Sequence, residues 1–572
     1  MPTLTIDGKQ IEVPKGTRLI EAAQKVAVDV PYYCYHPGLS IAGNCRMCLV
    51  EIEKMPKLQI ACHIEASEGM VVKTNTEKVL KTRQHILEFL LVNHPLDCPV
   101  CDQAGECWLQ DYYMKHGLYD SRLDENKVKK PKAVSIGPTV MLDAERCILC
   151  SRCVRFTDEI SKTSELGIVN RGDHSEITVF PEKELNNPYA GNVVDICPVG
   201  ALTDKDFRFK IRVWYLKTAD SICNGCSRGC NVQVQYNLDR PHHGKGDRVM
   251  RLKPRFNEKI NQWWMCDEGR YGYPYHDKNR ILHPMNRPLS PTLSPQAGRG
   301  STHVPLTLEG RERGEGLPSL LEMPWAEIIP EIVKHIQSSQ KKIGVFISPQ
   351  LSNEEIFLAR RLFRENLKLE NLFLLSPNPP GFQDDFLIRA DKNPNSKGAE
   401  LFGFSYDDKS VANFFAACGE GKIEGVLVFG QDLLTLHGTY LAESALGRLK
   451  WSVFLGSNHN LMSEFAAYVL PSATYVETEG TFTNFEGRIQ RFEKVLEPLG
   501  DARPVWEILI QLARKLGIHM HFDRAREIFE ELSQSVEAFR GLSYEKLAAG
   551  GSDIRALASP VIPALEQESN IL

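Results

Sequence analysis

The sequence has no apolar run long enough to cross a membrane, no excess of basic charge and almost no cysteine in its second half. A membrane-spanning helix needs about 20 consecutive apolar residues, so no spanning segment is predicted. A formal net charge of −5 and a pI near 6.4 argue against a nucleic-acid-binding protein. The opening residues, MPTLTIDG, have neither the basic and apolar regions of a signal peptide nor the arginines of a transit peptide, which favours a bacterial-type cytosolic chain.

Cysteine is concentrated in the first part of the chain. Fifteen of the 16 cysteines lie within 34–266, and the segment 267–572 contains only Cys418. Disulfide scaffolds are typical of small exported domains, whereas crowded cysteines in a long reduced chain are more often metal ligands. The sequence therefore predicts a metal-binding half and a second half with a different role. Cys418 is interpreted as a small buried apolar residue.

The segment 1–79 has the pattern of a small β-rich domain. Strands are predicted over 3–6 and 10–13, on either side of the turn Asp7-Gly8-Lys9. Thr17 is the predicted N-cap of an alanine-rich helix from 18 to about 28. A second, amphipathic helix is predicted over about 79–93, ending before His94-Pro95 because the residue before proline avoids the α region.

The second half begins after a stretch, 288–318, that is rich in proline, glycine and serine. These three residue types supply more than a third of it, so disorder is predicted there. Short β-type runs at 344–347, 426–429 and 453–455 then alternate with helical patterns such as 353–367. This alternation predicts an α/β domain with a largely parallel sheet.

Two sets of candidate ligands lie within 34–107. Four thiolates with one CxxC pair in a glycine-bearing loop can hold a [2Fe–2S] cluster, and a zinc ribbon is the alternative. The second set has three thiolates and a histidine, and imidazole can replace thiolate on iron. The alternative reading of that histidine is a residue that merely ends a helix. The first set is Cys34, Cys45, Cys48 and Cys62, and the second is His94, Cys98, Cys101 and Cys107.

Two further sets follow. The x2-x2 cysteine spacing of the third set, with a later Cys-Pro, is the bacterial ferredoxin pattern for a [4Fe–4S] cluster. The fourth set also fits a [4Fe–4S] cluster, with zinc as its alternative. Arg46 and Arg152 lie within ligand loops, where they either offset cluster charge or are solvated surface residues. The third set is Cys147, Cys150, Cys153 and Cys197, and the fourth is Cys223, Cys226, Cys230 and Cys266.

In this order, the motifs resemble the large iron–sulfur subunit of bacterial NADH–quinone oxidoreductase, the respiratory complex I. The motifs that carry the resemblance are Cys45-Arg46-Met47-Cys48, His94-Pro95-Leu96-Asp97-Cys98 and Cys147-Ile148-Leu149-Cys150 with Cys197-Pro198. The resemblance implies that His94 is a ligand and that the chain holds one [2Fe–2S] and three [4Fe–4S] clusters. It implies electron transfer from a subunit that binds NADH and FMN, through the first, third and second sets, to a two-cubane ferredoxin-like subunit.

The resemblance also implies a fold class and a location. The implied fold class is a multidomain protein with α+β and α/β domains. The resemblance also implies that the fourth cluster lies off the main electron path. NADH and quinone bind to partner subunits of the peripheral arm, so the chain has no complete catalytic site, and it associates indirectly with the cytoplasmic face of the membrane. The expected domains are a β-grasp [2Fe–2S] ferredoxin-type domain (1–79), a helical 4Fe–4S domain with one histidine and three cysteine ligands (80–119), a ferredoxin-type 4Fe–4S domain (138–217), a molybdopterin-oxidoreductase-type 4Fe–4S domain (219–275), a linker or insertion (286–320) and a truncated molybdopterin-oxidoreductase-like α/β domain (321–572).

The second half is similar to molybdopterin oxidoreductases through 467–472 and 479–488. No molybdenum is expected, because the region after the linker is short for two pterin-binding domains, no cysteine lies between Cys266 and Cys418, and glycine-rich phosphate loops are scarce. The competing hypotheses are a formate dehydrogenase alpha subunit, which needs a complete molybdenum site, and an iron–sulfur subunit associated with an NAD-linked hydrogenase. An iron-only hydrogenase would need further cysteines, and a four-zinc structural protein is disfavoured by the x2-x2 spacing.

Overall fold

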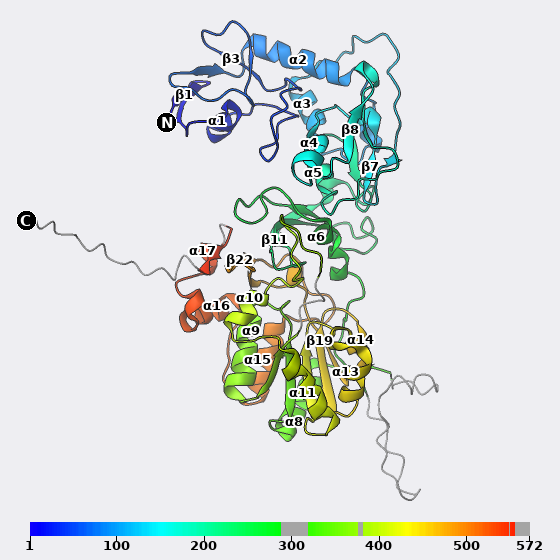
Figure 1. Ribbon diagram of the computed structural model, residues 1–572, viewed down its shortest axis with the longest axis vertical. Helices are drawn as coiled ribbons and strands as arrows, with labels where there is room; N and C mark the ends of the chain where they lie inside the picture. The colour runs from blue at the N-terminus through cyan, green and yellow to red at the C-terminus, as the bar shows by residue number, and fades with distance from the viewer. Residues whose placement is uncertain (288–318, 376–380, 548–549, 555–572) are drawn as a thin grey trace, which may run out of the picture. The chain divides into compact units, whose positions relative to one another are not determined.

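The structure, a computed structural model, describes residues 1–287, 319–375, 381–547 and 550–554 (Figure 1). The chain divides into two compact units. The first contains 1–217, 235–253 and 262–270, and the second contains 218–234, 254–261 and the residues from 271 onward. The predicted linker at 288–318 lies outside the described residues. No helix in the described part of the chain is both long enough and apolar enough to cross a membrane.

The first unit starts with a five-stranded mixed sheet in the order β2-β1-β5-β3-β4, packed against helix α1. The predicted hairpin is confirmed: Asp7 and Gly8 both have positive φ, which suits a two-residue turn. The elements are β1 (Thr3–Ile6), β2 (Lys9–Glu12), α1 (Leu19–Lys25), β3 (Leu49–Ile52), β4 (Gln59–Ile60) and β5 (Val71–Lys73).

The predicted start of α1 is wrong by one residue. Thr17 is not the N-cap, because its hydroxyl donates to the Pro14 carbonyl at 2.8 Å. Arg18 takes that position, and the Glu21 carboxylate accepts a hydrogen bond from the Arg18 N–H at 3.1 Å. The helix also ends earlier than expected, at Lys25. An acidic residue in the first turn therefore stabilises the helix start in place of a threonine cap.

Short elements carry the remaining ligand loops of the first unit. Helix α2 begins after its N-cap Thr76 and ends before His94-Pro95, as expected. A sheet of order β10-β7-β6 and a two-stranded β8-β9 pair follow. The elements are α2 (Glu77–Leu91), α3 (Trp108–His116), β6 (Val134–Ser135), β7 (Val140–Leu142), α4 (Arg152–Glu159), β8 (Leu166–Val169), β9 (Glu176–Val179), α5 (Asn192–Ile196), β10 (Leu202–Asp204) and α6 (Asp267–Tyr271).

A separate three-stranded sheet is formed by β11 (Lys217–Ile222), β12 (Asn231–Tyr236) and β13 (Val249–Pro254). Residues of this sheet belong to both units.

The second unit is built on a seven-stranded sheet in the order β15-β14-β20-β19-β18-β16-β17. The strands from β20 to β17 run parallel, as predicted, and β14 and β15 add an antiparallel edge. The strands are β14 (Met285–Asn286), β15 (Leu321–Glu322), β16 (Ile343–Ile347), β17 (Asn371–Leu374), β18 (Gly425–Phe429), β19 (Trp451–Gly456) and β20 (Tyr468–Pro471).

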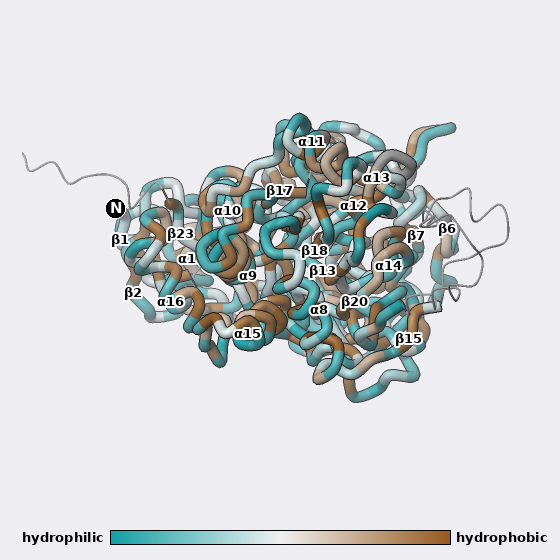
Figure 2. The backbone as a smooth tube through the Cα atoms, turned by 90° about the horizontal axis from the view of Figure 1, so that it is seen from below, coloured by the Kyte–Doolittle hydropathy of each residue, from teal (hydrophilic) through white to brown (hydrophobic). Residues whose placement is uncertain are grey.

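Successive residues of the central strands enter two different apolar cores. Val345 of β16 packs in the core that contains α8 (Trp325–Ser339), α9 (Asn353–Ala359), α15 (Val505–Lys515) and α16 (Ala525–Ser535). Phe346 packs in the core that contains α11 (Asp408–Gly419), α12 (Leu433–His437) and α14 (Leu461–Phe465). The brown stretches of α9 and α15 in Figure 2 belong to helices buried in the first of these cores. Parallel strands covered on both faces explain the continuous apolar runs in the sequence.

The helices of this unit are α8 (Trp325–Ser339), α9 (Asn353–Ala359), α10 (Ser396–Leu401), α11 (Asp408–Gly419), α12 (Leu433–His437), α13 (Thr439–Leu446), α14 (Leu461–Phe465), α15 (Val505–Lys515), α16 (Ala525–Ser535) and α17 (Tyr544–Leu547). The helix expected over 353–367 changes after Ala359 into a π-helical segment, Arg360–Asn366. A small sheet is formed by β21 (Gly480–Thr483), β22 (Arg488–Phe492) and β23 (Ser552–Asp553).

Candidate iron–sulfur centres

The four cysteines of the first set meet in the loops around β3 and β4. Cys34, Cys48 and Cys62 are almost completely buried, and Cys45 is half-buried. The Cys45 thiol contacts Cys34, and the Cys62 thiol contacts both Cys34 and Cys48. These hydrogen bonds lower the pKa of Cys34 and Cys48. Two of the contacts, Cys34 with Cys45 and Cys48 with Cys62, supply two thiols for each iron of a [2Fe–2S] cluster, so the donor set fits that group.

The second set lies between the end of α2 and the start of α3. Cys98 is exposed, Cys101 is buried, and Cys107 directly precedes α3. Burial raises the pKa of Cys101 and Cys107, and the nearby Cys98 thiol adds to both shifts. Buried thiols that resist ionisation as free groups become good ligands when a metal supplies the opposing charge. The three cysteines therefore fit three corners of a cubane.

His94 follows the last turn of α2, and the structure gives no direct contact between it and these cysteines. Its Nδ1 atom is buried and has no hydrogen-bond partner among the described residues. Burial, followed by the charge of Arg146, lowers the pKa of His94 to about 4, so the imidazole is neutral at pH 7. Neutral imidazole is the form that binds metals. Ligation by His94 therefore rests on this unpaired nitrogen.

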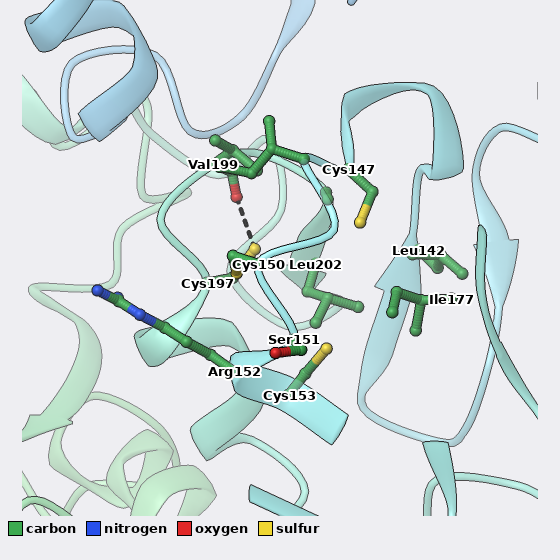
Figure 3. A pocket seen from close by; sticks show the side chains of 12 residues that line it. Leu142, Cys147, Cys150, Ser151, Arg152, Cys153, Ile177, Cys197, Val199 and Leu202 are labelled. Carbon is green, nitrogen blue, oxygen red and sulfur yellow. Dashed lines mark hydrogen bonds between the residues drawn. The ribbon is translucent and has the colours of Figure 1, made fainter. Parts of the chain in front are cut away.

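The third set surrounds one small apolar cavity, shown in Figure 3. Cys153 lies in the first turn of α4 and Cys197 directly follows α5, so two helix ends aim ligands at the same space. The Cys197 thiol donates to the Val199 carbonyl at 3.0 Å. Burial raises the pKa of Cys147 and Cys197 to about 12. The four cysteines share the cavity wall with Leu142, Ile148, Ile177, Val199, Ala201 and Leu202, which fits a buried cluster.

The fourth set is divided between the two units. Cys223, Cys226 and Cys230 lie in the connection from β11 to β12 and belong to the second unit. The Cys223 N–H donates to the Cys230 carbonyl at 2.8 Å, which closes this loop. Cys266, just before α6, belongs to the first unit. All four are buried, and their joint ligation remains a prediction.

In the described residues, no group of three or more His, Cys, Asp or Glu side chains has the arrangement of a site for a single metal ion.

The first three sets are joined by one cluster of apolar and cysteine side chains. It contains Cys34 of the first set, Cys107 of the second and Cys150 of the third. The Arg155 guanidinium donates to the carbonyls of Cys34 and Cys150, which ties the first set to the third. The sequence analysis did not identify Arg155 as a residue that joins the two sets. The available signal was its place three residues after Arg152, which puts both arginines on the same face of a helix.

The third and second sets meet at the loop that follows Cys197. The Trp108 N–H donates to the Pro198 carbonyl at 3.0 Å. Gly200 lies so close to Cys101 that a Cβ atom at this position would stand 2.3 Å from the Cys101 sulfur. A side chain here would displace the ligand, so glycine is required by the close approach. The third set therefore contacts both the first set and the second. The loop of the first set also contacts α3, since the rings of Tyr32 and Trp108 lie 5.3 Å apart.

The fold and these cysteine loops define an iron–sulfur protein with ferredoxin-type domains followed by a molybdopterin-oxidoreductase-type domain. Five family descriptions match the chain. They are the 2Fe-2S iron-sulfur cluster binding domain (1–77), the NADH-ubiquinone oxidoreductase-G iron-sulfur binding region (83–122), the NADH-quinone oxidoreductase subunit 3, ferredoxin-like domain (137–203), the NADH-ubiquinone oxidoreductase NDSU1/NuoG-like, 4Fe-4S domain (219–274) and molybdopterin oxidoreductase (398–515).

Curated relatives give a narrower identification. The G subunit of NADH-quinone oxidoreductase from Rickettsia bellii is 44% identical over 287 residues, which cover 50% of this chain and 41% of the relative. The mitochondrial NADH dehydrogenase [ubiquinone] iron-sulfur protein 1 of Solanum tuberosum is 45% identical over 282 residues, covering 49% and 37%. The matched region thus spans less than half the length of these relatives. The resemblance seen in the sequence is confirmed: over about half its length the chain is homologous to the G subunit of NADH-quinone oxidoreductase.

A similar solved structure is a chain of the NAD+-reducing [NiFe]-hydrogenase in the H2-reduced state, with 31% sequence identity and a TM-score of 0.34. The match covers 37% of this chain and 91% of the hydrogenase chain.

Proposed function

We propose that this chain is the iron–sulfur electron-transfer subunit of a proton-translocating NADH–quinone oxidoreductase, the respiratory complex I. It carries electrons from a subunit that binds NADH and FMN toward quinone, and it has no complete catalytic site of its own. The relatives' names support the complex, and the four cysteine-rich segments support the role. Each cluster accepts one electron at a time, so several in sequence distribute the two electrons of a hydride donor.

The observation that carries this proposal is the shared apolar cluster that contains cysteines of the first three sets. In this proposal electrons enter at the first set, pass to the third and leave from the second. Direct contacts of the third set with both other sets support this route. Ile148 and Val199, which belong to this cluster, exclude water from the space between the ligands. The residues of the chain thus hold the centres close together in a dry environment.

The proposed cofactors are one [2Fe–2S] cluster and three [4Fe–4S] clusters. Cys34, Cys45, Cys48 and Cys62 hold the first, and His94 with Cys98, Cys101 and Cys107 holds a cubane. The two other cubanes are held by Cys147, Cys150, Cys153 and Cys197, and by Cys223, Cys226, Cys230 and Cys266. When bound, these groups supply one-electron chemistry.

The proposed role of the second half is that of a packing scaffold without molybdenum. In α/β folds, ligands usually bind beyond the carboxyl ends of parallel strands. After β16 this region is filled by internal hydrogen bonds: the Asn353 amide donates to the Thr481 hydroxyl at 3.0 Å, and the Glu354 carboxylate accepts from the Thr481 N–H at 2.9 Å. The Tyr544 hydroxyl also donates to Glu354, at 2.9 Å.

The proposed electron exit is the loop around Cys98, where a two-cubane ferredoxin-like subunit docks. Cys98 is an exposed ligand, and its neighbours Leu96 and Val100 are 91% and 61% exposed. Exposed apolar side chains next to a redox centre are typical of a covered interface. Through the other subunits of the peripheral arm the chain associates indirectly with the cytoplasmic side of the membrane.

A pair of cysteine variants in the assembled complex tests the route. Cys153→Ala removes a ligand of the third set, and Cys226→Ala removes one of the fourth set, which the proposal leaves off the path. With NADH as reductant, we expect Cys153→Ala to retain the electron paramagnetic resonance (EPR) signal of the first centre but to lose reduction of the second centre and of quinone.

The matched variant, Cys226→Ala, is expected to keep quinone reduction. Retained quinone reduction in Cys153→Ala, with its third centre absent, would contradict the route. A formate dehydrogenase alpha subunit or a hydrogenase-associated subunit would use a different electron donor. Rapid reduction of the centres by formate or hydrogen, and not by NADH, would favour these alternatives.

A further inference from the structure

Arg152 is a buried cation between the loops of the first and third sets. Its side chain is 2% exposed and leaves the first turn of α4 in the direction away from the sulfur of Cys153 (Figure 3). The guanidinium donates to the carbonyl of Ile196, the residue before Cys197, at 3.0 Å. It also donates to the carbonyl of Tyr35, the residue after Cys34. One guanidinium therefore holds the backbone next to a ligand of each set.

No carboxylate pairs with this guanidinium in the described residues. The ionisable groups that face it include Cys34 of the first set and Cys150 and Cys197 of the third. The phenols of Tyr32 and Tyr112 and the imidazole of His36 also face it, and none of the three carries a negative charge at pH 7. The guanidinium also lies over the ring of Trp108, 4.6 Å from its centroid. Cation–π contact supplies some stabilisation but no opposing charge.

A buried arginine without an anionic partner is strongly destabilising, because desolvation of the charge is not compensated. Loss of its proton does not resolve this, since arginine stays charged in proteins. The anion has to come from another source, and the ligands of two proposed iron–sulfur centres surround the guanidinium. All-cysteine clusters carry net negative charge, which supplies the missing counter-charge.

We propose that Arg152 is the shared counter-ion of the first and third iron–sulfur centres and raises the reduction potential of both. This inference rests on the proposed function, because it needs both clusters to be present. Reduction adds one negative charge to a cluster, and a fixed nearby cation stabilises the reduced form more than the oxidised form. Arg152 is thus a tuning residue, positioned by Ile196 and Tyr35, and it does not itself carry electrons.

The other arginine that the sequence placed in a ligand loop provides a matched control. Arg46 lies between Cys45 and Cys48, is exposed to solvent and has positive φ. Water and salt screen such a charge, so it has little effect on a cluster. Both arginines lie inside a CxxC loop, Arg46 directly after its first cysteine and Arg152 directly before its second, but they differ in burial.

The test is an EPR-monitored redox titration of the assembled complex with chemical mediators. Arg152→Gln removes the charge and keeps an amide donor. We expect the ratio of reduced to oxidised centre, at a fixed solution potential, to fall at least tenfold at both centres, which corresponds to about 59 mV for a one-electron couple. Arg46→Gln should change the ratio less than twofold. Arg152→Lys, which keeps the charge, should lie closer to wild type than Arg152→Gln.

Unchanged ratios in an Arg152→Gln complex that retains both EPR signals would overturn the proposal, and so would a shift at only one centre. If Arg152→Gln loses the clusters, the Arg152→Lys variant distinguishes charge from geometry. Clusters retained in Arg152→Lys would show that the positive charge is required. Clusters lost in Arg152→Lys would show that the geometry of the guanidinium is what matters, which contradicts the proposal. Absence of both signals in the wild-type complex would instead refute the cofactor assignment.

Discussion

The two units of the chain reach a folded state by different means. In the second unit, a parallel sheet is covered on both faces, and the strands β16, β18 and β19 are buried along their whole length. In the first unit, the strands β1 to β10 have at most four residues each, and the ligand loops lie between these short elements. The second unit is stabilised by apolar packing, whereas the first depends on groups that hold loops together.

Two buried arginines, one from each unit, are compensated differently. In the second unit, Arg280 and Glu477, both almost completely buried, form an ion pair at 2.8 Å. In the first unit, Arg152 is equally buried but forms no ion pair with a carboxylate of the described residues. A buried charge without a counter-charge is costly, so Arg152 marks a place where an anionic group belongs.

The largest expected effect follows from removing iron. If a chelator strips the clusters under reducing conditions, the cysteine loops lose the bonds that connect them, because metal binding and folding are coupled in such sites. We expect amide hydrogen exchange to become fast throughout 26–48, 94–107 and 147–153. Exchange in β16, β18 and β19 should stay slow and serves as the internal control. Equal loss of protection in both units, or none in the ligand loops, would contradict the comparison.

A smaller effect is expected from pH in the second unit. Burial raises the pKa of the Glu354 carboxyl to about 7, whereas in an unfolded chain it is about 4.3. Between these values the folded state keeps a proton that the unfolded state has lost, so the free energy of unfolding falls as pH rises and levels off above pH 7. The total change is about 4 kcal/mol. Glu354→Gln should remove it.

Urea unfolding of wild type and Glu354→Gln at pH 5 and pH 8 measures the pH-dependent contribution of Glu354 to the free energy of unfolding. The two proteins should have similar stability at pH 5, and the variant should be more stable at pH 8. Glu497→Gln is the control, because that side chain is 85% exposed and should change stability by less than about 0.5 kcal/mol at either pH. A constant difference between Glu354→Gln and wild type across this range would show that the carboxyl does not titrate in the folded state.

The sequence predicted those parts of the fold that depend on local patterns. The hairpin around Asp7-Gly8 and the strands β16 and β18 follow from turn chemistry and continuous apolar runs. The start of α1 was wrong because the competing hydrogen bond from Thr17 to Pro14 is a detail of the turn that precedes the helix. The π-helical segment after Ala359 was also missed, because its sequence has an ordinary helical pattern.

Candidate ligands were readable from cysteine spacing, but their surroundings were not. The proximity of Gly200 to Cys101 joins residues far apart in the sequence, and no spacing rule indicates it. Arg152 and Arg46 looked equivalent in the sequence, and tertiary packing buries one and exposes the other. The relation of Cys266 to the other three cysteines of the fourth set remains a prediction from spacing alone.

The most direct test of the account is the content of iron, acid-labile sulfide and molybdenum per chain in anaerobically purified protein. One [2Fe–2S] cluster and three [4Fe–4S] clusters predict about 14 iron atoms, as many sulfides and no molybdenum. Near-stoichiometric molybdenum would refute the scaffold role of the second unit and favour a molybdenum enzyme. Zinc in place of iron would contradict the electron-transfer role of the whole chain.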